Sequence, residues 1–362
     1  MPLSVRLINQ LVLLRAIRLL IYPLIYPLIR WFGVLVPALM LSACGQTRIY
    51  SQESYVFGTR VQIAIAGVPE QQASAAASAV LAAFDVLHHR LHAWQPGELS
   101  SINNAFAAGK SVPVAPDMAA ILRDATADSE RSDGLFNPAI GQLIRLWGFE
   151  SDTFVPHAPD VSAIARLVAE HPAMQDIVIA HGDVYSRNPA VRVDLGGYGK
   201  GYALDVAASI LRSRGIHNAL INIGGNILAL GQHGDRPWRV GIQHPREPRA
   251  IASLELHDGE AIGTSGDYQR FFEWHGQRYC HIIDPRTGWP AQGVESVTVL
   301  IAPGPRAGTL SDVDSKPLFI AGARGWRQAA AQMGVQNAML IDAYGKIHLT
   351  ASMRGRLHFI SP

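Results

Sequence analysis

Short apolar runs separated by glycine- and proline-rich breaks fill the second half of the chain, and they restrict its fold more than any other feature. Seven runs are predicted to be strands: residues 177–180, 191–195, 219–230, 238–242, 251–256, 297–301 and 338–341. Only residues 201–214 and 324–333 have helical periodicity in this half. Because strands and helices do not alternate regularly, the sequence predicts an α+β fold with mixed or antiparallel sheets and packed helices.

The first half carries the longer helical segments. A predicted strand at residues 55–66 precedes an alanine-rich helical run at residues 70–94. Two further helices are predicted at residues 116–131, with Pro116 in the first turn, and at residues 160–170, with Asp160 as N-cap. No internal repeat or linker interrupts the pattern, so a single folded domain is expected.

Composition supports a globular protein and excludes one class of partner. The chain has 362 residues, of which 48% are hydrophobic and 17% charged, an ordinary balance for a folded domain. The net charge is only +2, and no basic run with interleaved aromatic residues is present. A nucleic-acid partner is therefore not expected.

The first 44 residues resemble an export signal. Four arginines are scattered among leucines and isoleucines, residues 31–41 are almost wholly apolar, and Leu41-Ser42-Ala43-Cys44 resembles a bacterial lipobox. We expect residues 1–43 to be a lipoprotein signal peptide and residues 44–362 to be the mature domain, anchored by lipid on Cys44 to the periplasmic face of the inner membrane. The alternative is an uncleaved anchor, because residues 11–41 are long for a signal and contain three prolines.

A glycine-rich segment at residues 194–202 is the first candidate ligand site. Its sequence, Asp-Leu-Gly-Gly-Tyr-Gly-Lys-Gly-Tyr, follows a predicted strand and opens a predicted helix, where free N–H groups can face an anion. It is not a Walker loop, because Lys200 is followed by Gly201. The alternative is a plain turn with a solvated lysine.

A second glycine cluster, residues 222–226, predicts either a strand with a bulge or simple sheet packing.

A third cluster concentrates polar chemistry in one hairpin-like stretch. Residues 263–268 read Gly-Thr-Ser-Gly-Asp-Tyr, and residues 279–288 read Tyr-Cys-His-Ile-Ile-Asp-Pro-Arg-Thr-Gly. His281 and Asp284 flank two apolar residues that would anchor them in the core. They are predicted to be catalytic, and the alternative is a structural pair that holds the hairpin.

These motifs, in this order, resemble the ApbE family of FAD:protein FMN transferases. The resemblance covers residues 55–350 and includes Gly-Thr at 58–59, Gly-Leu-Phe-Asn-Pro at 134–138 and Leu-Trp-Gly-Phe at 146–149, besides the clusters above. It implies a T-fold-like catalytic domain that transfers FMN from FAD to a Ser or Thr hydroxyl of an acceptor protein and releases AMP. The implied acceptors are FMN-binding subunits of membrane redox complexes or other exported FMN-binding domains.

The resemblance also implies which residues form the site. A Mg²⁺ ion is expected on the carbonyl of Gly197 and the carboxylate of Asp312. His281 is expected to act as the base toward the acceptor hydroxyl, with Asp284 orienting it or assisting the metal. The residues that the resemblance implies for FAD binding are Phe57, Trp94, Leu135, Phe136, Asn137, Asp194, Lys200, Thr264, Ser265 and Gly266. Lys316 is a further expected FAD-binding residue, which the resemblance does not imply.

Lys316 departs from the family pattern, which has a metal-ligating Thr at this position. A charged lysine has no lone pair and cannot ligate a cation. Three outcomes are open: Asp314 or Ser315 serves as ligand, the Lys316 charge substitutes for a cation at the pyrophosphate, or metal binding is weak. Asn137 also stands where the family usually has Asp, which removes one negative charge.

Two other functions use the same residues. A metal-dependent FAD pyrophosphatase would let water attack instead of a protein hydroxyl. A flavin-binding assembly lipoprotein would hold FAD without turnover, and only Lys316 favours it.

Overall fold

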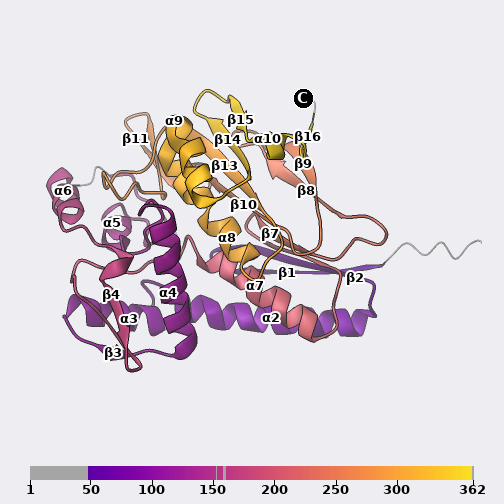
Figure 1. Ribbon diagram of the computed structural model, residues 1–362, viewed down its shortest axis with the longest axis horizontal. Coiled ribbons are helices and arrows are strands. Elements are labelled where there is room, and N and C mark those ends of the chain that lie inside the picture. The colour runs from indigo at the N-terminus through magenta and orange to yellow at the C-terminus, as the bar shows by residue number, and fades with distance from the viewer. Residues whose placement is uncertain (1–47, 152, 158–159, 361–362) are drawn as a thin grey trace, which may run out of the picture. The chain divides into compact units, whose positions relative to one another are not determined.

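An eight-stranded sheet, antiparallel throughout, organises the domain in this computed structural model (Figure 1). The structure describes residues 48–151, 153–157 and 160–360, and residues from Ile49 onward form one unit. Cys44 lies outside the described residues. In spatial order the strands are β1 (Ile49–Val56), β2 (Thr59–Ala66), β6 (Ala219–Ile223), β7 (Asn226–Leu230), β10 (Ala261–Gly266), β13 (Val294–Ile301), β14 (Asn337–Asp342) and β15 (Ile347–Leu349).

Four helices cover one face of this sheet. They are α2 (Glu70–Leu91), α7 (Gly199–Ser213), α8 (Ala307–Val313) and α9 (Ser315–Met333). The sheet residues Val61, Ile63 and Ile65 alternate along β2 and share a core with α2 and α7. Apolar residues at every second position therefore face the helices.

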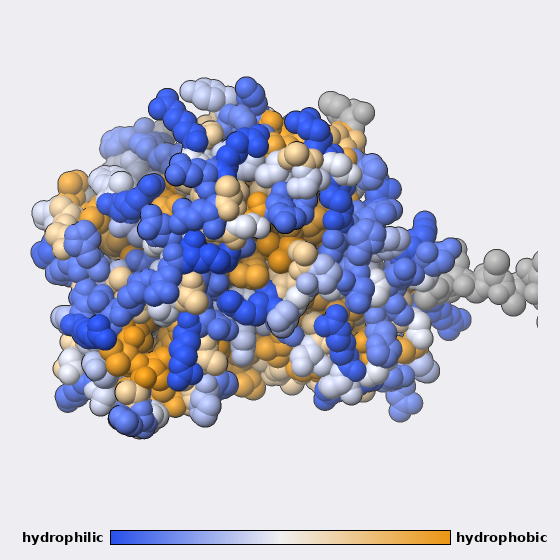
Figure 2. Space-filling view, in the orientation of Figure 1, coloured by the Kyte–Doolittle hydropathy of each residue, from blue (hydrophilic) through white to orange (hydrophobic). Residues whose placement is uncertain are grey.

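The opposite face is covered by a second, three-stranded sheet. It consists of β16 (His358–Phe359), β9 (Ala250–Leu256) and β8 (Trp238–Gln243). Of these, β8 and β9 share a separate core with β7, β10, β13 and β14. Because β7 and β13 have cover on both faces, they are buried along almost their whole length. On the face shown in Figure 2, hydrophilic side chains predominate and hydrophobic surface shows in smaller patches between them.

The remaining elements extend the domain beside the sheet. A small three-stranded sheet consists of β3 (Val112–Pro113), β5 (Asp183–Ser186) and β4 (Ile177–Ala180). A separate hairpin consists of β11 (Phe271–Trp274) and β12 (Gln277–Cys280). The other helices are α3 (Glu98–Ala107), α4 (Pro116–Arg131), α5 (Gly141–Leu146), α6 (Val161–Ala169), η1 (Met174–Asp176) and α10 (Ala351–Arg354). None of the helices in the described ranges combines the length and apolar character needed to cross a bilayer.

The α+β prediction is confirmed, and four of its elements need correction. Residues 219–230 form two strands, because Gly224 and Gly225 adopt positive φ and close a tight hairpin between β6 and β7. Residues 55–66 likewise span a turn, at Phe57 and Gly58. Residues 191–195 contain only an isolated bridge from Arg192 to Ile140. The last long helix begins nine residues earlier than predicted and is kinked at Gly322.

Helices α7 and α8 touch through two glycines. A Cβ added to Gly201 would lie 2.7 Å from Cβ of Asp312 and 2.8 Å from Cα of Thr309, and one added to Gly308 would lie 2.6 Å from the carbonyl oxygen of Gly201. No side chain larger than hydrogen fits at either position without moving a helix. The contact brings the start of α7 against Asp312 in α8.

We predict that Gly201→Ala destabilises the protein by about 1–3 kcal/mol, the usual cost of overpacking. Alanine favours a helix over glycine by ~1 kcal/mol, so any loss of stability must come from the contact with α8. Gly304→Ala is the control, since Gly304 is exposed and a Cβ there meets nothing within 4 Å. Urea unfolding of the two variants measures the difference. Equal midpoints would show that the helices separate at no cost.

Candidate active site

A buried carboxylate with two lysines forms the centre of the site. Asp312, in α8, is only 1% exposed. Its Oδ2 accepts a hydrogen bond of 3.0 Å from the Gly201 N–H and lies 3.7 Å from Nζ of Lys200. Its Oδ1 contacts Nζ of Lys316, which also donates to the Asp312 carbonyl oxygen at 2.7 Å. Two ammonium groups from different helices therefore converge on one carboxylate.

The charges of these groups depend on one another. Burial alone would raise the pKa of Asp312, but the ammonium groups of Lys200 and Lys316 hold it well below its ordinary value. Burial lowers the pKa of Lys316 to about 8, and the attraction of Asp312 limits that fall. Around neutral pH the cluster thus contains one negative and two positive charges.

A glycine-lined turn borders the cluster at the start of α7. Gly196 and Gly197 precede this helix, and a Cβ added to Gly197 would lie 3.1 Å from Cε of Lys316 and 3.6 Å from Cε2 of Phe136. Asp194 shapes the turn by accepting a hydrogen bond of 2.7 Å from the Gly196 N–H, and burial raises its pKa. Because Gly196 and Gly197 have no side chains of their own, the side chains of Lys316 and Phe136 can pack directly against the backbone of this turn.

Hydroxyl groups of β10 lie at the junction of α8 and α9. Ser265 Oγ is 2.7 Å from Ser315 Oγ, which donates to the carbonyl oxygen of Asp312 at 2.9 Å. Thr264 Oγ1 is 2.9 Å from Thr298 Oγ1 on the neighbouring strand. Gly266 ends β10 and packs against the ring of Tyr268. Of the three predicted residues in this strand, Ser265 is thus linked by hydrogen bonds to the cluster.

His281 is oriented by a backbone carbonyl. Its backbone N–H and its Nδ1 lie 3.0 and 3.2 Å from the carbonyl oxygen of Arg270. A carbonyl only accepts, so Nδ1 carries the proton and Nε2 keeps its lone pair. Burial, followed by the positive charges of Arg270 and Lys200, lowers the pKa of His281 to about 3. The imidazole is therefore neutral at physiological pH, as a proton acceptor must be, although it is a weaker base than an ordinary histidine.

Asp284 does not orient His281. Its carboxylate accepts hydrogen bonds from the backbone N–H, Nε and Nη2 of Arg286 at 2.9, 2.9 and 2.7 Å. Its carbonyl oxygen also accepts from the Gly288 N–H at 2.8 Å. The expectation that Asp284 holds the imidazole, whether for catalysis or as a structural pair, is therefore corrected: Asp284 holds the turn at residues 284–288, and the Arg270 carbonyl holds the imidazole.

Arg270 was not predicted from the sequence. It immediately precedes β11, and the pairing of Phe271 with Cys280 places it opposite His281. Its Nη2 donates to the carbonyl oxygens of Phe149 and Ser151 at 2.8 and 3.3 Å, while its Nε is buried and has no hydrogen-bond partner among the residues that the structure describes. A hairpin turn at residues 275–276 sets the register of the two strands, and this register places residue 270 opposite His281. Recognising the turn in the sequence could therefore have identified Arg270.

The predicted aromatic residues lie at the end of α2. The ring of Phe57 is 5.8 Å from Phe84 and 5.7 Å from His88, and the ring of Trp94 is 4.5 Å from His92. Both pack against the same core as Phe136, which reaches the glycine turn.

The loop after α4 supplies the other predicted contacts. Leu135 is partly buried, and its N–H donates to the carbonyl oxygen of Ser132 at 3.1 Å. The amide of Asn137 is used within the loops: it donates to the Pro172 carbonyl at 2.9 Å and accepts from the Ala139 N–H at 3.1 Å. Asn137 also lines a small hollow of about 170 Å³ together with Pro285, the residue after Asp284.

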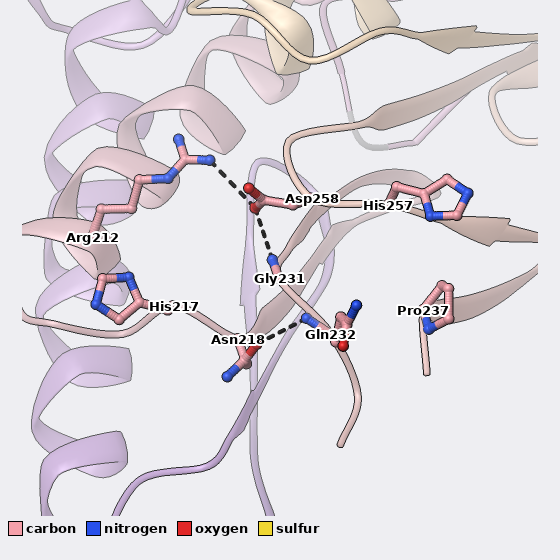
Figure 3. Close-up of a pocket in the computed structure, with 8 residues that line it drawn as sticks. All are labelled: Arg212, His217, Asn218, Gly231, Gln232, Pro237, His257 and Asp258. Atoms are coloured by element: carbon pink, nitrogen blue, oxygen red, sulfur yellow. Dashed lines mark hydrogen bonds and ion pairs between the residues drawn. The ribbon is translucent and has the colours of Figure 1, made fainter. Parts of the chain in front are cut away.

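A larger hollow, of about 420 Å³, lies at the other end of α7 (Figure 3). Arg212 and Asp258 point toward one another across it, 3.7 Å apart, and Asp258 also accepts from the Gly231 N–H at 2.8 Å. Lys200 and Arg212 are twelve residues apart on α7, a rise of about 18 Å. None of the predicted site residues lines this hollow, so it is separate from the cluster at Asp312.

The arrangement at Asp312 does not suit a Mg²⁺ ion. Both of its carboxylate oxygens are already engaged: Oδ2 accepts from the Gly201 N–H, and the Lys316 ammonium occupies the position at Oδ1 where a cation would bind. Asp314 points elsewhere, into an ion pair with Arg131. Within the described ranges, no group of three or more His, Cys, Asp or Glu side chains is positioned to hold a metal.

Comparisons with known proteins point to one family. A protein of Rhodobacter capsulatus named FAD:protein FMN transferase is 44% identical over 310 residues, which are 86% of this chain and 58% of that protein. The chain thus spans less than two thirds of this relative. A Treponema pallidum protein of the same name is 32% identical over 313 residues, covering 80% of this chain and 84% of that one.

Solved structures share the fold. The crystal structure of the ApbE protein of Thermotoga maritima has a TM-score of 0.77 and 29% identity, and it covers 85% of this chain and 99% of its own. The flavin transferase ApbE of Vibrio cholerae has a TM-score of 0.74 and 25% identity, covering 86% and 99%. A sequence model of the ApbE family matches residues 57–340, and the chain therefore belongs to the ApbE family.

Proposed function

We propose that this protein transfers FMN from FAD to a Ser or Thr hydroxyl of an acceptor protein and releases AMP. The observation that carries the proposal is the cluster of Lys200, Lys316 and Asp312 beside a glycine-lined helix start and a neutral His281. Fixed positive charge in a site with little water stabilises phosphate oxygens, which is the main requirement of phosphoryl transfer. Relatives named FAD:protein FMN transferase support the same activity.

In the proposed transfer of FMN, each of the site's side chains has a separate role. The acceptor oxygen forms a bond to the FMN phosphorus while the bond from that phosphorus to the bridging oxygen breaks, and the electron pair leaves on AMP. The hydroxyl proton passes to Nε2 of His281. Lys200 and Lys316 neutralise charge on the pyrophosphate, and the aromatic residues Phe57 and Trp94 offer surfaces for flavin or adenine stacking. No step depends on Mg²⁺, because the site as built does not fit that ion.

AMP release tests the activity itself. The protein is incubated with FAD alone and with a candidate FMN-binding acceptor domain, and AMP and acceptor mass are measured. We expect AMP to appear only with the acceptor, in equal amount to acceptor heavier by one FMN less one water. Free FMN formed without acceptor would instead establish a pyrophosphatase, and bound but intact FAD would establish a flavin-binding lipoprotein.

We predict that His281→Ala lowers FMN transfer by about 100-fold or more, the range for loss of a general base, while FAD affinity changes little. The exposed His358 supplies the control, His358→Ala, which should keep full activity. Transfer is measured at saturating FAD and acceptor, and affinity by quenching of flavin fluorescence. Equal losses in affinity and transfer would mean that His281 only maintains the structure.

We also propose that the protein is held at the periplasmic face of the inner membrane by lipid on Cys44, next to acceptor subunits of membrane redox complexes. The motif Leu41-Ser42-Ala43-Cys44 supports this proposal. Cys44→Ala should block processing and lipidation, which intact mass and fractionation of membranes detect. An unchanged size and unchanged membrane attachment would contradict it.

A further inference from the structure

Two of the four lysines in the chain meet at one buried carboxylate. Lys200 begins α7 and Lys316 begins α9, and both lie beside Asp312. Lys316 and Lys200 are both partly buried, and holding two ammonium groups next to a single carboxylate leaves excess positive charge, which costs free energy unless an anion joins the cluster. The cluster is therefore expected to be more stable with an anionic ligand bound than without one.

The side chain of Lys316 lies beside both of the residues expected to hold a metal. It contacts the side chain and the carbonyl oxygen of Asp312, and its Cε packs against Gly197. A charged ammonium and a divalent cation repel each other and cannot occupy the same position. The other acidic candidate, Asp314, is held away by Arg131.

Donor capacity remains for a ligand. An ammonium has three N–H groups, and Lys316 directs two of them to Asp312. Lys200 makes one hydrogen bond, of 3.2 Å, to the Gly196 carbonyl. Each lysine thus retains at least one donor for a phosphate oxygen, beside a turn whose glycines leave room for it.

We propose that Lys316 is a built-in cation that takes the place of a divalent metal, so that Lys200 and Lys316 together hold the pyrophosphate of FAD. The inference rests on the proposed function for the identity of the ligand. It makes binding of FAD largely independent of Mg²⁺, and it explains why a lysine stands where a hydroxyl ligand is expected.

FAD binding with and without metal tests the inference directly. Dissociation constants are measured by flavin fluorescence in excess EDTA and in saturating MgCl₂. The unmodified protein should show a difference of less than about threefold. Lys316→Thr should bind FAD about 10–100-fold more weakly in EDTA, as expected for loss of one charge-assisted contact, and Mg²⁺ should restore most of the affinity.

Lys346→Thr is the matched control, because Lys346 is exposed and lies in the turn between β14 and β15. It should bind FAD as the unmodified protein does in both solutions. If Lys316→Thr fails to fold, the unmodified protein alone decides: binding that requires Mg²⁺ overturns the inference. Metal-independent binding without FMN transfer would leave the inference standing and overturn the proposed function, so the two failures are distinguishable.

Discussion

The close contact between α7 and α8 is the constraint on which the site depends. Gly201 and Gly308 let the two helix backbones meet, and this contact places the Gly201 N–H on the carboxylate of Asp312. A side chain at either glycine would push apart the two segments that carry Lys200 and Asp312. Lys200 and Asp312, more than a hundred positions apart in sequence, thus belong to one charged cluster because Gly201 and Gly308 let their helices touch.

Burial gives this cluster its chemical character. In water, two lysines near one aspartate would interact weakly, whereas here the ammonium groups hold the pKa of the buried Asp312 well below its ordinary value, and Asp312 in turn limits the fall in the pKa of Lys316. Burial, together with the positive charges of Arg270 and Lys200, lowers the pKa of His281 and keeps it neutral, and the Arg270 carbonyl fixes which nitrogen is free. In the proposed function, the positive charges of Lys200 and Lys316 bind the phosphates of FAD and the neutral imidazole of His281 accepts the proton, so that no metal ion has to bind first. Because its pKa is lowered, His281 is a weaker base than an ordinary histidine. A bound anion would offset the surrounding positive charge and raise this pKa again.

Sequence patterns predicted the parts of the site but not all of their connections. Apolar runs predicted the α+β fold, and glycine and hydroxyl clusters pointed to the segments around Lys200, Ser265 and His281. Two relationships depended on tertiary contacts and could not be derived from spacing. Asp284, three residues from His281, bonds to Arg286 instead, and Arg270, eleven residues from His281, supplies the carbonyl that orients it. The hairpin at residues 219–230 was missed because two adjacent glycines were interpreted as a bulge within one strand.

The most direct test of the account is a crystal structure of the protein grown with both FAD and Mg²⁺. The account predicts phosphate oxygens of FAD within hydrogen-bonding distance of the Lys200 and Lys316 ammonium groups, Nε2 of His281 facing the phosphate of the FMN half, and no metal on Asp312. A Mg²⁺ ion bound to Asp312 and to the carbonyl of Gly197, with Lys316 turned away from the phosphates, would contradict it.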